Sequence, residues 1–395
     1  MDRMRCSHTP SVTAPLIQLM PKVPPTPPGG THAHHPLYLN LGGHLLAAAH
    51  NNSIRLIAID LDGTLLGDDG RVSPRNLAAL HAAHSRGVQL VVATGRRHSF
   101  AMRVLRPLGL HPDSILISSN GTVTRTLGAP TSQQGLSASP IPSRLLARTH
   151  LPHATAVWLC AHIRGTGDRD FRNALVLTFD RTQPDGEDSR GALVVERLDH
   201  LTASISRWMA ANEPYLVQVT PIERALADPS DPPIQAMLCG TLERMARAEV
   251  RLLEHPGVVV SGHASECSGA PSIAVSSRWV GSNTSELQHQ LTLHRTEYSA
   301  RDLSILDILP AGCSKGAALL TLAADRDIDP AEILAIGDNW NDVSMLQAAG
   351  RAVLMDNAPE DLKTLARASG WSIAPSNRDD GVARAIESTL SASVG

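Results

Sequence analysis

The stretch IRLIAIDLDGTLLGDDG, residues 54–70, decides the fold class of this chain. Its first part is apolar and rich in β-branched residues up to Ile59, which predicts a buried strand. Asp60 and Asp62 follow at the carboxyl end of that strand, before a turn at Gly63. Because this end of a parallel sheet opens towards ligands, two acids there indicate a binding or catalytic role.

The segments after this strand continue an alternation of helices and strands. Ser73 and Pro74 suit the N-cap and first position of a helix and Gly87 suits its exit, which predicts a helix over 74–86. Two further buried strands, joined by a helix, are predicted from VQLVVA and SILIS. From Ser314 the alternation resumes with a helix, the strand ILAIG, a helix and the strand AVLM. This order predicts an α/β fold with a Rossmann-like parallel sheet.

Between residues 125 and 305 the alternation breaks down. The stretch holds one clear helical pattern and several short strand-like runs, which suits an α+β unit. The runs are ALVLTF, LVVERL, YLVQVT, PIQAML and SIAVSS, and the helical pattern is TLERMARAEVRLLEH. We therefore expect an α/β core interrupted by an inserted α+β domain. The expected organisation is a leader over 1–52, a core over 53–124 and 306–395, an insertion over 125–305, and hinges near Asn120–Gly121 and Leu309–Gly312.

The composition narrows the class of protein and its partners. With 395 residues and 42% hydrophobic side chains, the chain is long enough for two or more globular units. A net charge of -3 and the lack of basic runs interleaved with aromatics argue against a nucleic-acid partner. No apolar run reaches the roughly 18 residues of a membrane span, so no membrane partner is expected. Five cysteines without a CxxC pair favour reduced thiols. Nothing in the sequence indicates an oligomeric state.

Residues 1–52 differ in composition from the rest of the chain. They hold eight prolines within the first 36 residues, a THAHH run, and Asp2 as the one acid. An acid-poor leader of this kind resembles a transit peptide for a plastid or mitochondrion. The alternative is a disordered tail without an address, which would leave a soluble protein in the cytoplasm.

Four short motifs fall at predicted strand ends or helix starts. They are DLDGT at 60–64, TGR at 94–96, SKG at 314–316 and GDNWND at 337–342. The carboxyl ends of parallel strands share one crevice, so the four motifs are expected to converge on one site. An EF-hand calcium loop is excluded for DLDGT because its register of oxygen ligands is incomplete.

The charges of these motifs call for a cation. Asp60, Asp62, Asp338 and Asp342 would place four negative charges in the crevice against one positive charge from Lys315. Without further cations this repulsion would raise at least one carboxyl pKa strongly, so a divalent ion is expected. Oxygen-only ligands favour Mg²⁺, which also accepts an oxygen of a substrate phosphate.

A wider set of motifs carries a resemblance to a known family. In chain order the set is DLDGTLL, ATGR, ISSNG, ILPAGCSKGAAL, GDNWNDVSML and DGVARAI. It resembles the haloacid dehalogenase-like phosphohydrolases, and among them the Cof-type phosphatases with a class II cap. The likeness covers about 53–124 and 305–390, and it is only positional for the insertion, which would be the substrate-selecting cap.

The resemblance also implies roles for individual residues. It implies that Asp60 is the nucleophile and that Asp62 protonates the leaving group and then activates water. The substrate phosphate would be held by Thr94, Gly95, Lys315 and Asn341. The metal would be held by Asp60, Asp62, Asp338 and Asp342.

The expected function is Mg²⁺-dependent hydrolysis of a small phosphorylated metabolite through an aspartyl-phosphate intermediate. Sugar phosphates, phosphorylated flavin precursors and pyridoxal phosphate are all compatible with the resemblance. The alternatives are a sugar phosphomutase on the same fold and a non-catalytic sensor of a phosphorylated metabolite. A sensor would be expected to lack the nucleophile or a metal-binding acid, and this sequence lacks neither.

Overall fold

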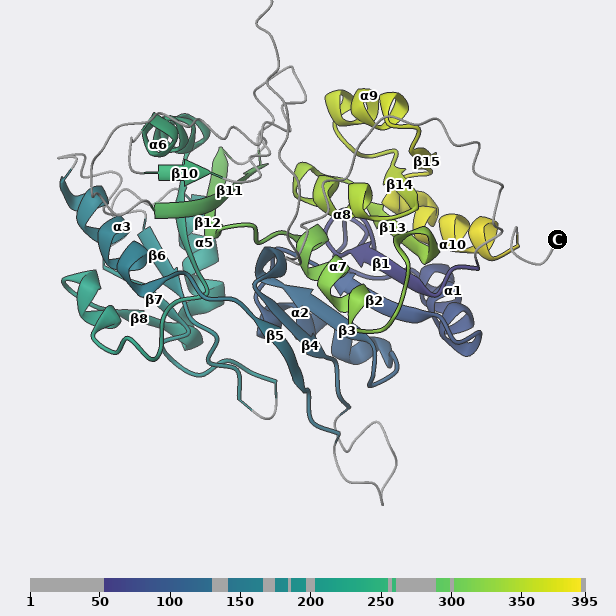
Figure 1. The fold of residues 1–395 in the computed structure, drawn as a ribbon, viewed down its shortest axis with the longest axis horizontal. Helices are drawn as coiled ribbons and strands as arrows, with labels where there is room; N and C mark the ends of the chain where they lie inside the picture. The colour runs from purple at the N-terminus through teal and green to yellow at the C-terminus, as the bar shows by residue number, and fades with distance from the viewer. Residues whose placement is uncertain are drawn as a thin grey trace, which may run out of the picture. The chain divides into compact units, whose positions relative to one another are not determined.

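The computed structural model describes an α/β protein built on two β-sheets (Figure 1). The described residues are 53–129, 141–165, 175–183, 186–196, 203–254, 258–260, 289–298 and 302–391. The expected leader at 1–52 and the SIAVSS run at 272–277 lie outside them. No described helix is both long enough and apolar enough to cross a membrane.

The first sheet, here called the core sheet, has eight strands in the order β15-β14-β13-β1-β2-β3-β4-β5. It is parallel from β15 to β3, whereas β4 and β5 add antiparallel pairs. Its strands are β1 Leu56–Asp60, β2 Gln89–Ala93, β3 Ile115–Ser118, β4 Val123–Thr126, β5 Leu145–Arg148, β13 Ile333–Gly337, β14 Arg351–Met355 and β15 Ser372–Ala374. The predicted parallel core is confirmed.

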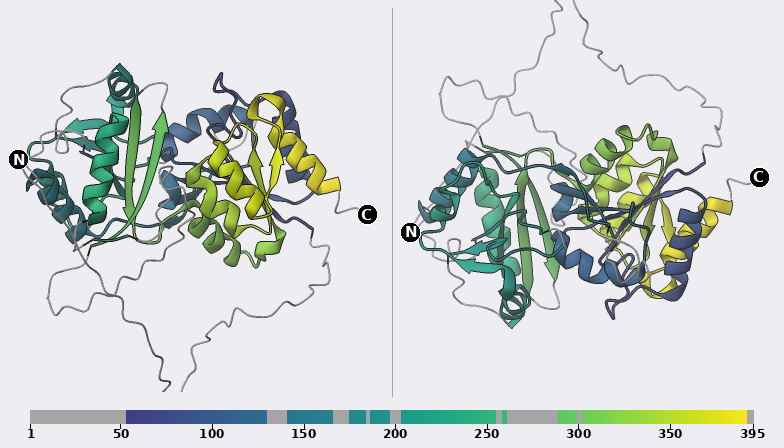
Figure 2. Two further views of the ribbon diagram at one scale, coloured as in Figure 1. Left: turned by 90° about the horizontal axis from the view of Figure 1, so that it is seen from above. Right: turned by 90° about the horizontal axis from the view of Figure 1, so that it is seen from below.

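Helices cover both faces of the core sheet because its strands are apolar on both sides (Figures 1 and 2). Ile57 and Ile59 of β1 face one helical layer, and Leu56 and Ala58 face the other. The first layer is α1 Pro74–Ser85, α2 His98–Leu105 and α10 Gly381–Ser391. The second is α7 Lys315–Ala324, α8 Val343–Ala348 and α9 Glu360–Ala368.

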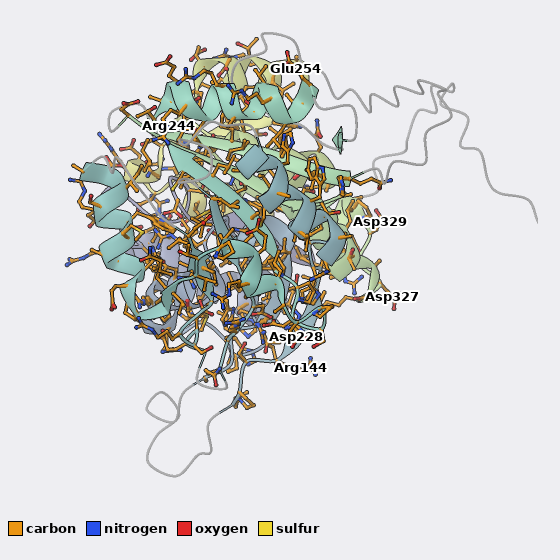
Figure 3. The ribbon with its side chains drawn as sticks, turned by 90° about the vertical axis from the view of Figure 1, so that its left-hand side faces the viewer. Arg144, Asp228, Arg244, Glu254, Asp327 and Asp329 are labelled. Carbon is orange, nitrogen blue, oxygen red and sulfur yellow. The ribbon has the colours of Figure 1, made fainter. Side chains whose placement is uncertain are left out.

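Side-chain caps set the starts of several elements. Ser73, the predicted N-cap of α1, accepts a hydrogen bond from an N–H of the first turn. Ser314 caps α7 in the same way, accepting from the Ala317 N–H at 3.1 Å. Asp329, labelled in Figure 3, forms a capping box with Glu332 immediately before β13. These caps set the starts of α1, of α7 and of the short 3₁₀ turn Pro330–Glu332 before β13.

The second sheet has seven strands in the order β10-β11-β12-β9-β6-β7-β8. They are β6 Leu175–Thr178, β7 Leu193–Val195, β8 Leu216–Gln218, β9 Gln235–Gly240, β10 Val258–Val260, β11 His289–Tyr298 and β12 Leu303–Pro310. One face packs against α3 His153–Gly165 and α6 Leu242–Glu254, and the other against α5 Ala203–Asn212. Arg244 and Glu254 mark the two ends of α6 in Figure 3. The inserted α+β domain is therefore confirmed.

The chain passes between the two sheets at other points than the sequence predicted. Both β4 and β5 belong to the core sheet, so the insertion begins near residue 149 and not at 125. Strand β12 stays in the second sheet up to Pro310, so the return comes after 310 and not after 305. Asn120–Gly121, the predicted first hinge, lies in a tight turn between β3 and β4. We use "the insertion" below for residues 149–310.

Candidate active site

The carboxyl ends of neighbouring parallel strands form the edge on which the candidate site is built. The register pairs Asp60, the last residue of β1, with Ala93, the last residue of β2. On the other side β13 runs parallel to β1 and ends at Gly337. Thr94 and Asp338 therefore follow their strands close to Asp60. The structure brings together the motifs that were expected to converge.

Three of the predicted acids lie close together, and two of them pair with one lysine. Asp60, Asp338 and Asp342 each offer a carboxylate oxygen, and these oxygens lie within 4.8 Å of one another. Lys315 Nζ donates to Asp60 Oδ1 at 2.5 Å and to Asp342 Oδ1 at 2.6 Å. Lys315 is 0% exposed, so its charge is compensated by these carboxylates and not by water.

The excess of acids over cations is reflected in the pKa values. Burial, and then Asp342, raise the pKa of Asp60 well above its usual range, although Lys315 acts in the opposite direction. Burial and Asp342 also raise the pKa of Asp338 to about 7. Burial disfavours the Lys315 ammonium, but Asp342 and Asp60 outweigh it and raise the pKa of Lys315 above its ordinary value. The cluster keeps a charged lysine and has the capacity to bind a further cation.

Hydrogen bonds orient the two acids of the GDNWND motif. Asp342 Oδ2 accepts from the N–H groups of Asp338 and Asn339, each at 3.0 Å. A Cβ at Gly337 would lie 2.6 Å from the Asp342 Cβ, so a residue without a side chain is needed where the loop folds back. Thr64 Oγ1 donates to Asp338 Oδ1 at 2.7 Å. Both carboxylates are thus held in place by the protein itself.

Asn357 also supports the cluster and was not singled out from the sequence. Its Nδ2 donates to Gly63 O at 2.8 Å and to Asp338 Oδ2 at 3.3 Å. Asn357 lies just past the end of β14, a parallel strand of the core sheet. Residues just past the carboxyl ends of parallel strands were expected to form the site, and Asn357 meets this criterion as well.

Asp62 lies apart from the three clustered carboxylates. Its carboxylate accepts two hydrogen bonds from Arg96, from Nε at 2.7 Å and from Nη2 at 2.5 Å. Its side chain is 50% exposed, whereas Asp60 is buried. The structure therefore does not group the Asp62 carboxylate with the other predicted metal-binding acids. A carboxyl held at the solvent side suits proton transfer better than metal binding.

The other predicted phosphate-binding residues meet at the turn between β3 and β4. Thr94 is buried, and its Oγ1 accepts the Arg96 N–H at 3.1 Å. Asn341 Nδ2 donates to Asn120 Oδ1 at 3.3 Å. A Cβ at Gly95 would lie 3.1 Å from the same Asn120 oxygen. Asn120, which the sequence suggested only as a hinge, thus links these groups.

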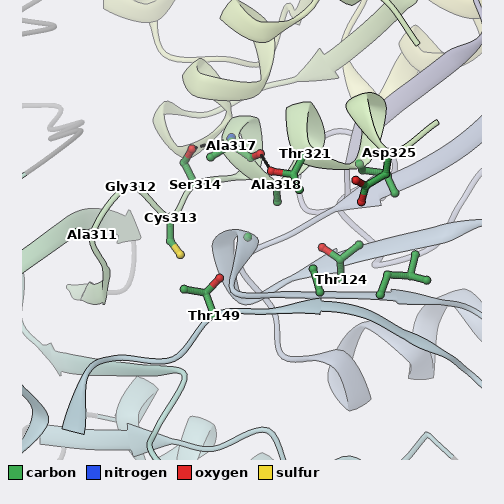
Figure 4. Close-up of a pocket in the computed structure, with 14 residues that line it drawn as sticks. Thr124, Thr149, Ala311, Gly312, Cys313, Ser314, Ala317, Ala318, Thr321 and Asp325 are labelled. Carbon is green, nitrogen blue, oxygen red and sulfur yellow. Dashed lines mark hydrogen bonds between the residues drawn. The ribbon is translucent and has the colours of Figure 1, made fainter. Parts of the chain in front are cut away.

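A separate hollow lies beside the return from the insertion to α7 (Figure 4). Its volume is about 240 Å³, and its wall includes Thr124, Thr149 and the linker 311–314. Cys313 lines it, and burial raises the pKa of the Cys313 thiol. None of the three clustered acids lines this hollow, so it is not the candidate active site.

Comparison with known proteins identifies the family. The family model of the haloacid dehalogenase-like hydrolases matches residues 57–150 and 282–386. The chain belongs to the haloacid dehalogenase-like hydrolases. The matched segments include Asp60, Lys315 and Asp338, together with both edges of the insertion. The family expected from the sequence motifs is confirmed.

Known members of this family that resemble the chain include named phosphatases. Phosphatase YwpJ of Bacillus subtilis (strain 168) is 27% identical over 344 residues, which are 85% of this chain and 100% of YwpJ. The HMP-PP phosphatase of Serratia proteamaculans (strain 568) is 26% identical, over 79% of this chain and 87% of that protein. These matches support the expected Cof-type phosphatase, a phosphoric monoester hydrolase.

A solved structure agrees with the fold. The crystal structure of a haloacid dehalogenase-like hydrolase from Bacteroides thetaiotaomicron matches with a TM-score of 0.57 and 23% identity. The match covers 85% of this chain and 99% of that chain, so it extends over both the core and the insertion. The α/β core with an inserted domain is thus shared with that haloacid dehalogenase-like hydrolase.

Proposed function

We propose that this chain is a Mg²⁺-dependent phosphatase that hydrolyses a small phosphorylated metabolite through an aspartyl-phosphate at Asp60. The observation that carries the proposal is the cluster of Asp60, Asp338 and Asp342, in which the buried Lys315 pairs with Asp60 and Asp342. The phosphatases among the relatives support the reaction class. The proposed substrates are sugar phosphates, phosphorylated flavin precursors or pyridoxal phosphate.

The donor atoms of the cluster fit Mg²⁺. Three carboxylates and one ammonium leave two negative charges uncompensated when all are ionised, and every donor is an oxygen. Asp342 accepts three hydrogen bonds, one from Lys315 and two from backbone N–H groups. Asp338 accepts two, from the neutral side chains of Thr64 and Asn357, and Asp60 accepts one, from Lys315. We therefore assign the ion to Asp60 and Asp338, with Asp342 orienting the loop. When bound, Mg²⁺ would neutralise the acids and polarise a phosphoryl oxygen.

In the first step an oxygen of Asp60 forms a bond to phosphorus while the bond from phosphorus to the ester oxygen breaks. Asp62 gives its proton to that leaving oxygen. In the structure Arg96 donates a hydrogen bond to each oxygen of the Asp62 carboxylate, so the protonated form that acts in this step has to give up one of the two. The Thr94 hydroxyl, the Gly95 N–H and the Asn341 amide are proposed to hold the phosphoryl oxygens, with Lys315 adding its charge.

In the second step water attacks the phosphorus of the aspartyl-phosphate. The Asp62 carboxylate takes the proton of this water, and the bond between phosphorus and the Asp60 oxygen breaks. One water is consumed, and one alcohol and one phosphate are released. Asp60 returns as a carboxylate and Asp62 as a carboxylic acid, so the site is ready for the next turnover.

A phosphate-release screen tests the proposed function. The purified protein is assayed on a panel of phosphorylated metabolites with Mg²⁺ and with a chelator, beside the Asp60→Asn variant. We expect Mg²⁺-dependent release of inorganic phosphate from at least one metabolite and none from the variant. Transfer of the phosphoryl group to another position of the sugar would instead indicate a mutase. Binding of a metabolite without conversion would indicate a sensor.

The insertion and the leader complete the proposal. We propose that the insertion selects the leaving group, because it is the part of the chain that the four motifs do not account for. For residues 1–52 we propose a plastid or mitochondrial transit peptide on the composition alone. Residues 1–52 fused to a fluorescent protein test this proposal. Import of the fusion into either organelle would support a transit peptide, and a fusion that stays in the cytoplasm would reject it.

A further inference from the structure

Asp307 is a buried acid in a mostly apolar strand. It lies in the middle of β12, whose sequence is LSILDILP, and it is 8% exposed. In the second sheet it is paired with His294 of β11 and Met237 of β9. Burial raises the pKa of Asp307 to about 7, although a hydrogen bond from Asn120 acts in the opposite direction. A carboxyl in such a place is costly to the fold, so its presence needs a reason.

The partner of Asp307 lies in the core and not in the insertion. Asn120 Nδ2 donates to Asp307 Oδ2 at 3.0 Å. Asn120 belongs to the turn Ser119–Gly121, is 2% exposed and has φ 52°, a left-handed conformation. Its N–H donates to Thr94 O at 3.1 Å, so the turn is fastened to the TGR motif. A buried acid of the insertion therefore meets the turn that joins the candidate phosphate-binding groups.

The same turn also packs against the start of α7. A Cβ at Gly121 would lie 2.2 Å from Ser314 O, the N-cap residue directly before Lys315. Asn120 Oδ1 in turn accepts from Asn341 Nδ2 at 3.3 Å and abuts Gly95. A displaced Asn120 side chain would thus disturb several of the proposed phosphate ligands together.

The Asp307 carboxyl sets which group donates and which accepts in the hydrogen bonds that join Asp307, Asn120 and Asn341. The Asp307 oxygen that faces Asn120 is an acceptor, so the Asn120 amide must turn its NH₂ group towards it. The Asn120 carbonyl then points to Asn341, which donates to it. Without the acceptor at residue 307 the orientation of the Asn120 amide rests on the hydrogen bond from Asn341, whose own amide can flip as well.

We propose that Asp307 is a positioning residue for the phosphoryl-binding groups, acting from the insertion through the Asn120 amide. The proposal rests on the proposed phosphatase function. Strand β12 leads through the linker 311–314 to Lys315, so the strand that carries Asp307 also carries the lysine of the site. Asp307 and Lys315 thus lie on one continuous segment of the chain.

Substitutions at residue 307 separate positioning from a structural role. Asp307→Leu has a similar size and suits an apolar strand, so it should fold at least as stably as the wild type, but it offers no acceptor to Asn120. Asp307→Asn keeps an acceptor oxygen. Asn120→Ala and the double variant Asp307→Leu/Asn120→Ala show whether the two residues act together. Ser304→Ala is the matched control, because Ser304 is a buried polar residue of the same strand.

The readouts are kcat and KM for p-nitrophenyl phosphate, the dissociation constant of inorganic phosphate with Mg²⁺, and the melting temperature. We expect Asp307→Leu to lose about tenfold or more in kcat/KM and in phosphate affinity without a lower melting temperature. Asp307→Asn should stay within about threefold of the wild type, as the acceptor is retained. The double variant should lose no more than Asn120→Ala alone, and Ser304→Ala should be unchanged.

Full activity and phosphate affinity in Asp307→Leu would overturn the proposal. Losses that multiply in the double variant, or an inactive but folded Asp307→Asn, would overturn it as well. If the leucine does not fit, the smaller Asp307→Val makes the same comparison. A wild-type protein without Mg²⁺-dependent phosphate release would reject the proposed function, whereas the phosphate dissociation constants would still decide the role of Asp307.

Discussion

The cluster of Asp60, Asp338 and Asp342 holds three carboxylates but one positive charge, that of Lys315. The effect of a single substitution in the cluster should therefore depend on whether it removes a negative or the positive charge. Asp60→Asn removes one charge from a site where burial and Asp342 already raise the pKa of Asp60. We expect the variant to fold as stably as the wild type or more so, since Lys315 keeps Asp342 as a partner. Turnover should fall by about 10⁴-fold or more, because an amide does not form the acyl phosphate.

Phosphate release and thermal melting together check the expectation for Asp60→Asn. Asp69→Asn provides the control, because it removes the same charge from an exposed turn of the same loop. A folded Asp60→Asn protein that turns over near the wild-type rate would remove Asp60 as the nucleophile.

Asp307 should make stability depend on pH with a defined sign. Its pKa is about 7 in the folded protein against 3.8 for an ordinary aspartate, so the folded state binds the proton more tightly. The stabilisation that proton binding at Asp307 gives to the folded state is therefore complete below pH 3.8, and it is lost as the pH rises through about 7. Relative to Asp307→Asn, the wild type should lose about 2–3 kcal/mol between pH 5 and pH 8. Urea unfolding of both proteins at the two pH values measures this, and a constant difference would contradict it.

The sequence predicted the site residues that lie in a recognisable motif at the end of a strand. It missed the residues whose role comes only from a contact with a residue far away in the sequence. Asp60 and Asp338 followed from strand ends. The role of Arg96 depends on Asp62, which follows a different strand, so the TGR motif alone did not reveal it. Asp307 is masked in the sequence by the apolar run around it, and its contact with Asn120 spans 187 positions.

At the scale of elements, the close approach of α7 and α8 brings Lys315 and Asp342 together. A Cβ at Gly316 would lie 2.1 Å from Ser344 O, so the two helices touch through the glycine. We expect Gly316→Ala to force them apart, at a cost of about 1–3 kcal/mol in unfolding free energy. It should also reduce kcat/KM by separating the lysine from its carboxylate partner.

Gly370→Ala is the matched control for this substitution. Gly370 has φ +72°, and a Cβ there would meet nothing within 4 Å, so the variant carries backbone strain without a clash. It should cost about 1 kcal/mol in stability and leave the kinetic constants unchanged. Denaturation and steady-state kinetics compare the two, and an unaffected Gly316→Ala would contradict the packing argument.

The elements themselves were predictable where hydrophobic periodicity was strong. The parallel strands of the core and the amphipathic α6 carry such a pattern. Strand β5 does not, because its side chains are exposed or half-buried at the edge of the sheet. That absence of pattern is why the boundary of the insertion was placed too early.

At the scale of the whole molecule, the insertion contacts the core through charged groups as well as through Asp307. Asp188 of the insertion pairs with Arg97, the N-cap residue of α2, and accepts a hydrogen bond at 2.5 Å from the hydroxyl of Ser99 in the first turn of that helix. The side chains of the ion pair are 10% and 4% exposed. Asp188→Ala leaves the Arg97 charge buried, which should cost roughly 3–5 kcal/mol and raise KM for the metabolite substrate.

The ion pair of Arg181 with Asp231 gives the control for Asp188→Ala. It lies within the insertion and is partly exposed, with side-chain exposures of 33% and 45%. Asp231→Ala should therefore change stability by less than about 1 kcal/mol and leave KM unaffected. Melting curves and kinetics on the metabolite distinguish the two variants. Equal effects would show that the contact with α2 is unimportant for the site.

Covalent trapping of the phosphoryl group tests the central claim most directly. In Asp62→Asn the group that activates water is lost, so a phosphoryl group transferred from a reactive ester should remain on the protein. The Asp62→Asn protein is mixed with p-nitrophenyl phosphate and Mg²⁺, quenched in acid and analysed by peptide mass spectrometry, with Asp60→Asn/Asp62→Asn as the control. We expect one phosphoryl group on the peptide that contains Asp60, and none in the control. A phosphoryl group on another residue, or release of phosphate by wild type in a single turnover without any phosphorylated protein, would contradict the mechanism.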